Sequence, residues 1–213
     1  MKNIAISLFD LTGTMMKPWL ESGYECWIFD IQHRSGIDSD GNLMRVGCDL
    51  SVPLDLDLFG LRKEEVRFVS AFPPCDHLAV SGARWFRGKG LRALSQSIQL
   101  FATAAEFCEF TSAPYMIENP VSTISTYWRK PDYVFQPFQY TGFCHEDNYT
   151  KKTCLWTGNG FVMPSPFEAD VGKPDDRIHK APPGEGRKNF RSATPEGFAR
   201  AVFESNASAK KED

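Results

Sequence analysis

The first residue whose type and setting suggest chemistry is Cys75, which follows the dipeptide Pro73-Pro74. Two prolines stiffen the backbone before the thiol, and such a turn presents a side chain instead of packing it into a sheet. A nucleophilic cysteine needs a lowered pKa or groups that stabilise what it attacks. Residues 77–92 contain no acidic residue. They contain four cations: Arg84, Arg87, Lys89 and Arg92. The structural alternative is a buried thiol beside a solvated basic loop.

A second candidate is Glu118, which follows the apolar run Tyr115-Met116-Ile117 and precedes Asn119-Pro120. Burial of a carboxyl group raises its pKa, so that it can share or donate a proton near neutral pH. The structural alternative is a glutamate that accepts hydrogen bonds from nearby backbone. His77 lies two residues from Cys75 and raises the possibility of a cysteine hydrolase, but no third orienting residue accompanies it.

Glycine and aspartate follow the first three predicted strands, at Gly13, Asp30 and Asp49. Glycine lets a ligand approach the backbone closely, and an acidic residue after the second strand can accept the ribose hydroxyls of an adenosine. An aspartate in such a place is more often a helix cap or a turn residue. The sequence has neither the G-x-G-x-x-G nor the P-loop pattern, which disfavours dinucleotide and nucleoside triphosphate sites.

Strands and helices must bring these residues together, and the pattern predicts an α/β fold with a largely parallel sheet. The predicted strands are residues 4–10, 25–30, 43–46, 66–72, 115–117, 133–138 and 153–156. A helix is predicted from the first turn through Trp19, and a longer one over residues 91–110, with an apolar face formed by Leu91, Leu94, Ile98, Phe101, Ala105 and Cys108. In open α/β sheets ligands bind at the carboxyl ends of the strands. The candidate residues Gly13, Asp30, Asp49, Cys75 and Glu118 all follow predicted strands.

With these motifs in this order, the chain resembles the DNA cytosine-5 methyltransferases, in particular short phage-type members. Residues 8–13, LFDLTG, with Gly23-Tyr24-Glu25, are similar to the family's first cofactor motif, and Phe72-Pro73-Pro74-Cys75 with Ser81-Gly82-Ala83-Arg84 is similar to its catalytic segment. Glu118-Asn119-Pro120 stands where the family has Glu-Asn-Val. Leu11 and Thr14 replace two family glycines, and the QxRxR segment has no clean counterpart, so Lys152 is the nearest match to its last arginine.

The resemblance implies a Rossmann-like methyltransferase fold, S-adenosylmethionine as cofactor, and duplex DNA with a flipped-out cytosine as substrate. Its catalytic residues would be Cys75, Glu118 and Lys152. The implied cofactor-binding residues are Phe9, Asp10, Gly13, Asp30, Ile31, Asp49, Leu50 and Pro73, and the implied substrate-binding residues are Arg84, Arg87, Asn119, Arg187 and Lys188. Two alternatives stay open: methylation of a cytidine nucleotide or RNA, and a degenerate relative that binds DNA or cofactor without turnover.

The sequence predicts a catalytic domain over residues 1–170. It predicts an exposed basic loop over residues 171–191, which could serve as a minimal recognition element. A C-terminal helix that begins at Thr194-Pro195, and a tail, are predicted over residues 192–213. A net charge of −3 gives no global basic field. The six cysteines form no CxxC pair, and Cys144, His145 and Cys154 do not complete a zinc set, so no metal is expected. The chain shows neither a membrane-spanning run nor a secretion signal, and a cytoplasmic location is expected.

Overall fold

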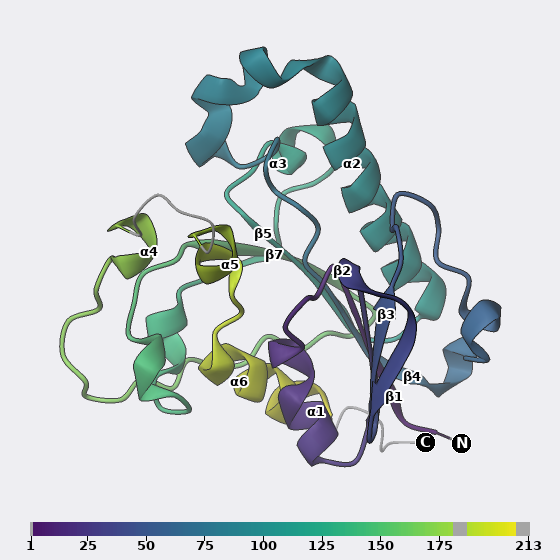
Figure 1. Ribbon diagram of the computed structural model, residues 1–213. Helices are drawn as coiled ribbons and strands as arrows, with labels where there is room; N and C mark the ends of the chain where they lie inside the picture. The colour runs from purple at the N-terminus through teal and green to yellow at the C-terminus, as the bar shows by residue number, and fades with distance from the viewer. Residues whose placement is uncertain (1, 181–186, 208–213) are drawn as a thin grey trace.

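A seven-stranded sheet with the order β3-β2-β1-β4-β5-β7-β6 organises the molecule (Figure 1). The computed structural model describes residues 2–180 and 187–207, without the side chains of residues 179 and 187–189. The strands are β1 (Ile4–Leu8), β2 (Glu25–Asp40), β3 (Leu43–Gly47), β4 (Val66–Ala71), β5 (Tyr115–Pro120), β6 (Tyr133–Phe135) and β7 (Thr153–Gly158). All seven predicted strands are present, with ends that differ by a few residues except in β2.

The sheet is mostly parallel, as the sequence predicts. Strand β1 pairs in parallel with both β2 and β4, and β4 pairs in parallel with β5. Strand β7 runs antiparallel to its neighbours β5 and β6. The order is compatible with a Rossmann-like fold, in which the strand order reverses beside β1 and the crevice for ligands lies outside the carboxyl ends. Because β7 is reversed, its first residues lie at the same edge as the last residues of β5.

Strand β2 is longer than predicted because the chain turns back on itself after Asp30. Residues 26–30 pair with 43–47 in register, and residues 37–40 then pair with 46–43 in the opposite direction. The returning segment crosses the end of β3 so closely that a Cβ on Gly47 would lie 2.3 Å from the Arg34 carbonyl oxygen. The returning segment and β3 therefore form a β-hairpin. In a regular α/β unit a helix would connect the two parallel segments, residues 26–30 and β3.

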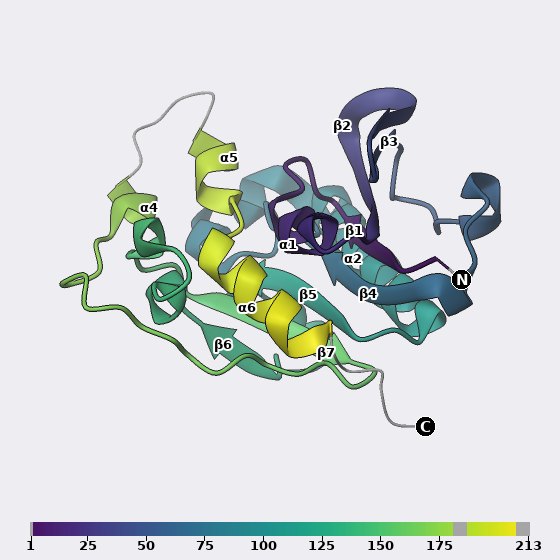
Figure 2. The ribbon, with the colours of Figure 1, turned by 90° about the horizontal axis from the view of Figure 1, so that it is seen from below.

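Helices cover both faces of the sheet. The α-helices are α1 (Lys17–Glu21), α2 (Phe86–Thr111), α3 (Ile124–Tyr127), α4 (Arg177–Lys180), α5 (Arg187–Ser192) and α6 (Glu196–Asn206). Short 3-10 turns are η1 (Thr14–Met16), η2 (Leu56–Phe59), η3 (Lys63–Glu65), η4 (Val80–Trp85), η5 (Pro137–Tyr140) and η6 (His145–Asp147). Helices α1 and α6 lie next to one another (Figure 2) and bury Trp19, Phe198 and Val202 against one face of the sheet. Helix α2 buries Phe101 and Cys108 against the other face of the sheet.

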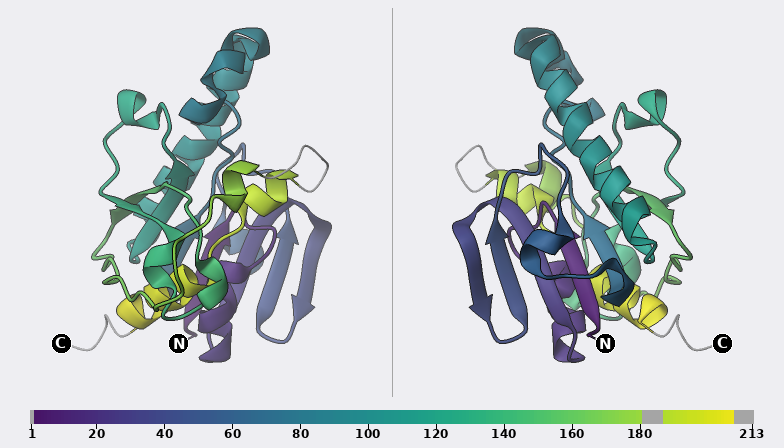
Figure 3. Two further views of the ribbon diagram at one scale, coloured as in Figure 1. Left: turned by 90° about the vertical axis from the view of Figure 1, so that its left-hand side faces the viewer. Right: turned by 90° about the vertical axis from the view of Figure 1, so that its right-hand side faces the viewer.

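Two expectations about the helices need correction. The sequence predicts Leu91 on the apolar face of the long helix, but this residue is 84% exposed because α2 begins earlier and its first turns extend beyond the sheet (Figure 3). The predicted loop over residues 171–191 contains the short helices α4 and α5, and its residues 181–186 lie outside the described part of the chain. The helix predicted after Thr194-Pro195 is confirmed as α6, with Pro195 at its N-cap.

Candidate functional site

Cys75 lies in a tight turn directly after β4. Its carbonyl oxygen accepts hydrogen bonds from the backbone N–H groups of Leu78 (3.0 Å) and Ala79 (2.9 Å). The turn is tied to the loop after β5, because Val80 N donates to Val121 O at 2.9 Å and Thr123 N donates to Leu78 O at 2.9 Å. The loops that follow the neighbouring strands β4 and β5 are thus one hydrogen-bonded unit.

Asn119 joins the same two segments from within the sheet. Its Nδ2 donates to the Pro73 carbonyl oxygen at 2.9 Å, and the side chain is buried. Its Oδ1 is also buried and accepts no hydrogen bond from any described residue. Glu118 precedes it on β5 and keeps 14% of its side chain exposed. The residues predicted from the two motifs therefore meet at one edge of the sheet.

A lysine completes this cluster, and it is Lys151, one residue before the predicted Lys152. Lys151 Nζ lies 3.9 Å from Glu118 Oε1, with only 13% of its side chain exposed, and it donates to the Ala193 carbonyl oxygen at 3.0 Å. Lys152 is exposed. The strand register distinguishes the two lysines, and the motif alone does not contain it. Leu155 pairs with Glu118, so their side chains lie on the same face of the sheet. Because side chains alternate along the chain, Lys151 falls on this face and Lys152 on the other.

The charges of this cluster act on the thiol. Burial, with the carboxylates of Glu118 and Asp76, raises the pKa of Cys75 to about 11, against a lowering by Lys151. Burial also raises the pKa of Glu118, which Lys151 partly offsets. The free protein at neutral pH consequently holds Cys75 as a thiol, and Glu118 takes up a proton more readily than an ordinary glutamate.

The hydrolase and zinc alternatives find no support in the geometry. The Nδ1 of His77 pairs with Ser97 Oγ of α2 at 3.0 Å, which holds the imidazole to the helix. Cys144 donates to Glu146 at 3.4 Å. Among the described residues, no group of three or more histidine, cysteine or acidic side chains is arranged to hold a metal ion.

The first predicted cofactor turn follows β1, at the carboxyl edge that also carries Cys75. Phe9 has a left-handed backbone (φ 56°), which is costly for a bulky residue and is found where the surrounding structure imposes it. Asp10 is buried and its two oxygens are already engaged: Oδ1 accepts from the N–H groups of Thr12 (3.0 Å) and Gly13 (2.7 Å), and Oδ2 accepts from Ser7 Oγ (2.8 Å). Asp10 therefore shapes the turn.

The residues at the end of the first half of β2 fit an adenosine better than this turn does. Asp30 is 8% exposed, and its Oδ1 accepts from Gln32 N at 2.8 Å, while Oδ2 accepts none of the hydrogen bonds found among the described residues. Ile31 beside it is 69% exposed and offers apolar surface. Asp49 is exposed and caps Ser51 N at 2.8 Å, whereas Leu50 is buried in the core. A carboxylate oxygen and an exposed aliphatic side chain at one strand end suit a ribose and a purine.

The predicted substrate-binding cations lie in two places. Arg84 and Arg87 are exposed in η4 and at the start of α2. Arg187 and Lys188 belong to α5, and their side chains lie outside the described part of the structure. Helix α5 is nevertheless linked to the cluster, because Ala193, which accepts from Lys151, follows its last residue Ser192.

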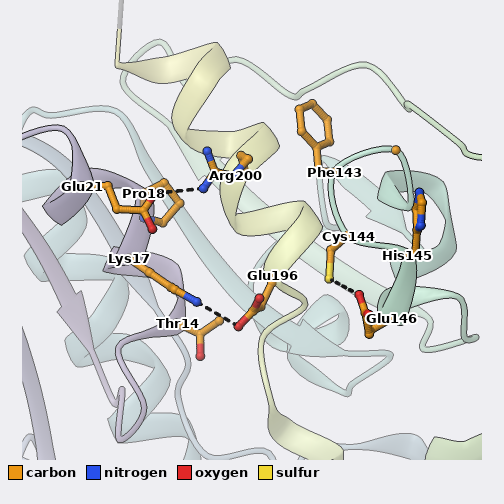
Figure 4. A pocket seen from close by; sticks show the side chains of 11 residues that line it. Thr14, Lys17, Pro18, Glu21, Phe143, Cys144, His145, Glu146, Glu196 and Arg200 are labelled. Atoms are coloured by element: carbon orange, nitrogen blue, oxygen red, sulfur yellow. Dashed lines mark hydrogen bonds and ion pairs between the residues drawn. The ribbon is translucent and has the colours of Figure 1, made fainter.

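Two cavities lie away from these residues. The larger, of about 440 Å³, is enclosed by α1, α6 and residues 142–146, and ion pairs join Lys17 to Glu196 (3.3 Å) and Arg200 to Glu21 (2.8 Å) across it (Figure 4). The smaller, of about 260 Å³, lies between residues 54–64 and Phe110. Neither is lined by Cys75, Glu118 or Asp30.

Comparison with known proteins identifies no family. No family model matches the chain, and no curated protein matches its sequence. Within the described residues, no helix has the length and apolar character needed to cross a bilayer.

Proposed function

We propose that this protein is an S-adenosylmethionine-dependent methyltransferase that methylates carbon 5 of cytosine in DNA through a covalent bond from Cys75. The observation that carries the proposal is the meeting of a thiol, a carboxyl group and an ammonium group at one sheet edge. Cys75 comes from the turn after β4, Glu118 from the end of β5, and Lys151 from the residues before β7. These are the groups needed to add to a pyrimidine ring and to stabilise the charge that the addition creates.

The fold supports the cofactor class. The sheet is compatible with the Rossmann-like fold that the resemblance implies, because β1, β2, β4 and β5 pair in parallel and the ligand crevice of such sheets lies outside the carboxyl ends of the strands. Asp30 and Ile31 lie where the first half of β2 ends, at the carboxyl edge of the sheet, and they offer a carboxylate and an exposed apolar side chain to an adenosine. When bound, S-adenosylmethionine would supply an electrophilic methyl group.

The proposed reaction begins at Cys75. The thiolate adds to C6 of the cytosine, and the electron pair of the C5–C6 bond moves to C5, with charge shared onto N3. Glu118 in its protonated form donates to N3, and the ammonium group of Lys151 stabilises the negative charge near it. C5 then takes the methyl group from the sulfonium of S-adenosylmethionine, whose S–CH3 bond breaks and which leaves as S-adenosylhomocysteine. Loss of the C5 proton to solvent and breakage of the C6–S bond restore the aromatic ring and the thiolate, and the proton on N3 returns to Glu118.

The electrostatics couple these steps to substrate binding. Burial is the main cause that raises the pKa of Cys75 in the free protein, and the negative charge of Glu118 adds to it. A proton held between Glu118 and N3 of the base removes the repulsion from Glu118, while the cation of Lys151 remains. Neutralisation of Glu118 in this way acts against the burial and favours the thiolate.

DNA is favoured over a free nucleotide because exposed cations follow the nucleophile directly, in η4 and at the start of α2. Such charges neutralise phosphates of a polymer, and a base in a duplex must leave the stack to reach a buried thiol. The test is transfer of a labelled methyl group, measured side by side on duplex DNA, RNA and dCMP. We expect label in DNA at carbon 5 of cytosine; label only in RNA or dCMP would replace the proposed substrate, and no label in any of them would contradict the proposal.

A further inference from the structure

Both backbone groups of Lys151 are bound by side chains of neighbouring segments. The lysine lies in the irregular segment before β7, beyond the point where the ladder between β6 and β7 ends at the pair Phe135 and Thr153. Its N–H donates to Gln136 Oε1 at 2.8 Å, and its carbonyl oxygen accepts from Thr153 Oγ1 at 2.9 Å. The backbone of Lys151 is therefore fixed by the residue after β6 and by the first residue of β7.

Gln136 is itself held at the end of β6. Its backbone is extended (φ −128°, ψ 142°), and its N–H donates to Gln139 Oε1 at 2.7 Å. Pro137 follows with a restricted φ and begins η5. Helix α6 packs on this strand (Figure 2), and the rings of Phe135 and Phe198 are stacked with 3.8 Å between their centres. The carboxamide of Gln136 therefore belongs to a rigid part of the molecule.

The place of the Lys151 ammonium group depends on how firmly the residue is held. A lysine side chain carries its charge on a flexible four-carbon stem, so burial of the stem and fixing of the backbone confine the charge. Only 13% of this side chain is exposed, and Nζ donates to the Ala193 carbonyl oxygen at 3.0 Å. The 3.9 Å between Nζ and Glu118 Oε1 is too long for a hydrogen bond, so the influence of Lys151 on Glu118 and Cys75 acts through space and varies with its position.

We propose that Gln136 is a positioning residue of the site, whose carboxamide oxygen fixes the backbone of Lys151 and so keeps the ammonium group beside Glu118. Thr153 serves the same purpose from β7 through its hydroxyl group. A charge that is fixed before the reaction needs no reorganisation when negative charge develops on the base. This benefit to methyl transfer rests on the proposed function, whereas the effect of Gln136 on the thiol does not.

The experiment follows the alkylation of Cys75 across pH by peptide mass spectrometry. Gln136→Met keeps a side chain of similar length and removes the acceptor for Lys151 N. The ammonium group is then less confined and opposes the raised pKa of Cys75 less, so the Cys75 curve should move to higher pH, by less than in Lys151→Met. Because one pKa unit changes the thiolate about tenfold, alkylation near neutral pH should be about 2- to 10-fold slower than in the wild type.

A double variant separates positioning from a general structural effect. In the Lys151→Met background, Gln136→Met should cause no further shift, because the charge that it places is gone. Gln99→Met is the matched control: Gln99 Nε2, on α2, donates to the Ser51 carbonyl oxygen at 2.7 Å, so this variant also loses one glutamine hydrogen bond. It should leave the Cys75 curve in place.

Thr153→Val provides a second route to the same result, because it removes the hydroxyl group that binds the Lys151 carbonyl and keeps the shape of the side chain. It should shift the Cys75 curve in the same direction. An unchanged curve in Gln136→Met, or in Thr153→Val if Gln136→Met does not fold, would overturn the inference. An equal shift by Gln136→Met in the wild-type and Lys151→Met backgrounds would overturn it too. The expected shifts in a protein that transfers no methyl group would keep the inference and reject the proposed reaction.

Discussion

At the scale of single residues, burial and three neighbouring charges set the pKa of Cys75. Burial and the carboxylates of Glu118 and Asp76 raise that pKa, the ammonium of Lys151 lowers it, and the result is about 11. Lys151 is thus the neighbouring side chain whose charge favours the thiolate. The neighbouring Lys152 acts on another thiol: burial raises the pKa of Cys154, and the charge of Lys152 partly offsets that rise.

This difference gives a matched pair of variants. Lys151→Met removes a charge that lowers the pKa of Cys75, so that pKa should rise and the alkylation curve of Cys75 should move to higher pH. Lys152→Met should move the curve of Cys154 and leave that of Cys75 in place, and Glu118→Gln should shift Cys75 to lower pH. Alkylation rates at each cysteine, followed by peptide mass spectrometry across pH, provide the measurement. Identical Cys75 curves in the two lysine variants would exclude the role given to Lys151.

Asp30 is the residue on which the adenosine assignment depends. Asp30→Asn keeps an oxygen that can accept from Gln32 N and removes the charge offered to a ribose. Titration calorimetry with S-adenosylhomocysteine should show a loss of about 1.5–3 kcal/mol. Asp38→Asn, on the exposed returning half of β2, serves as the control and should bind as the wild type does. Unchanged affinity in Asp30→Asn would remove the assignment.

At the scale of elements, a buried carboxylate holds η6 to the start of α6. Asp147 Oδ2 accepts from Gly197 N at 2.7 Å, and burial raises the pKa of Asp147 from 3.8 to about 6 in spite of that bond. A raised carboxyl pKa means that ionisation costs folding free energy. The stability from this group is full below about pH 4 and is lost as pH rises through about 6.

Asp147→Asn isolates this effect, because the amide keeps an acceptor for Gly197 N and does not titrate. At about pH 7.5 the variant should be more stable than the wild type by about 1–3 kcal/mol, and the difference should shrink towards pH 4. Urea unfolding at several pH values measures it. A difference that stays constant with pH would contradict the assignment.

The close passage of the returning segment of β2 over the end of β3 can be tested by a substitution at Gly47. Gly47→Ala would place a methyl group 2.3 Å from the Arg34 carbonyl oxygen and should destabilise the fold by about 1–3 kcal/mol. Gly88→Ala is the control, since a Cβ there meets no atom within 4 Å. It should leave stability equal or slightly higher, because alanine favours a helix. Equal urea midpoints for Gly47→Ala and wild type would show that the hairpin lies elsewhere.

The sequence predicts the buried strands well, because runs of β-branched and aromatic residues such as Val66–Ala71 favour a strand over a helix or a loop. It misses the returning half of β2, since residues 31–40 are mostly polar and lack alternation. It places the apolar face of α2 correctly at Phe101 but extends it to Leu91, which nothing in the core covers. The choice of Lys151 over Lys152 needs the pairing of Glu118 with Leu155, a long-range register that local pattern does not contain.

At the scale of the whole molecule, the sheet order explains how distant motifs form one site. Strands β1, β4 and β5 and the first half of β2 end at one edge, and the reversed β7 begins there. The turn that carries the nucleophile and the proposed adenosine residues consequently lie at the same edge of the sheet, while the larger cavity lies apart, between α1 and α6.

Formation of a covalent adduct tests the central claim most directly. A duplex containing 5-fluorocytosine has no proton to lose from C5, so a methylating enzyme should remain bonded to it after transfer. With S-adenosylmethionine present, we predict that the wild type gives an adduct resistant to denaturation whose mass includes one methyl group, with the cross-link mapped to Cys75. Cys75→Ser should give none while binding S-adenosylhomocysteine as the wild type does. An adduct at another residue, or substantial methyl transfer by Cys75→Ser, would contradict the proposed mechanism.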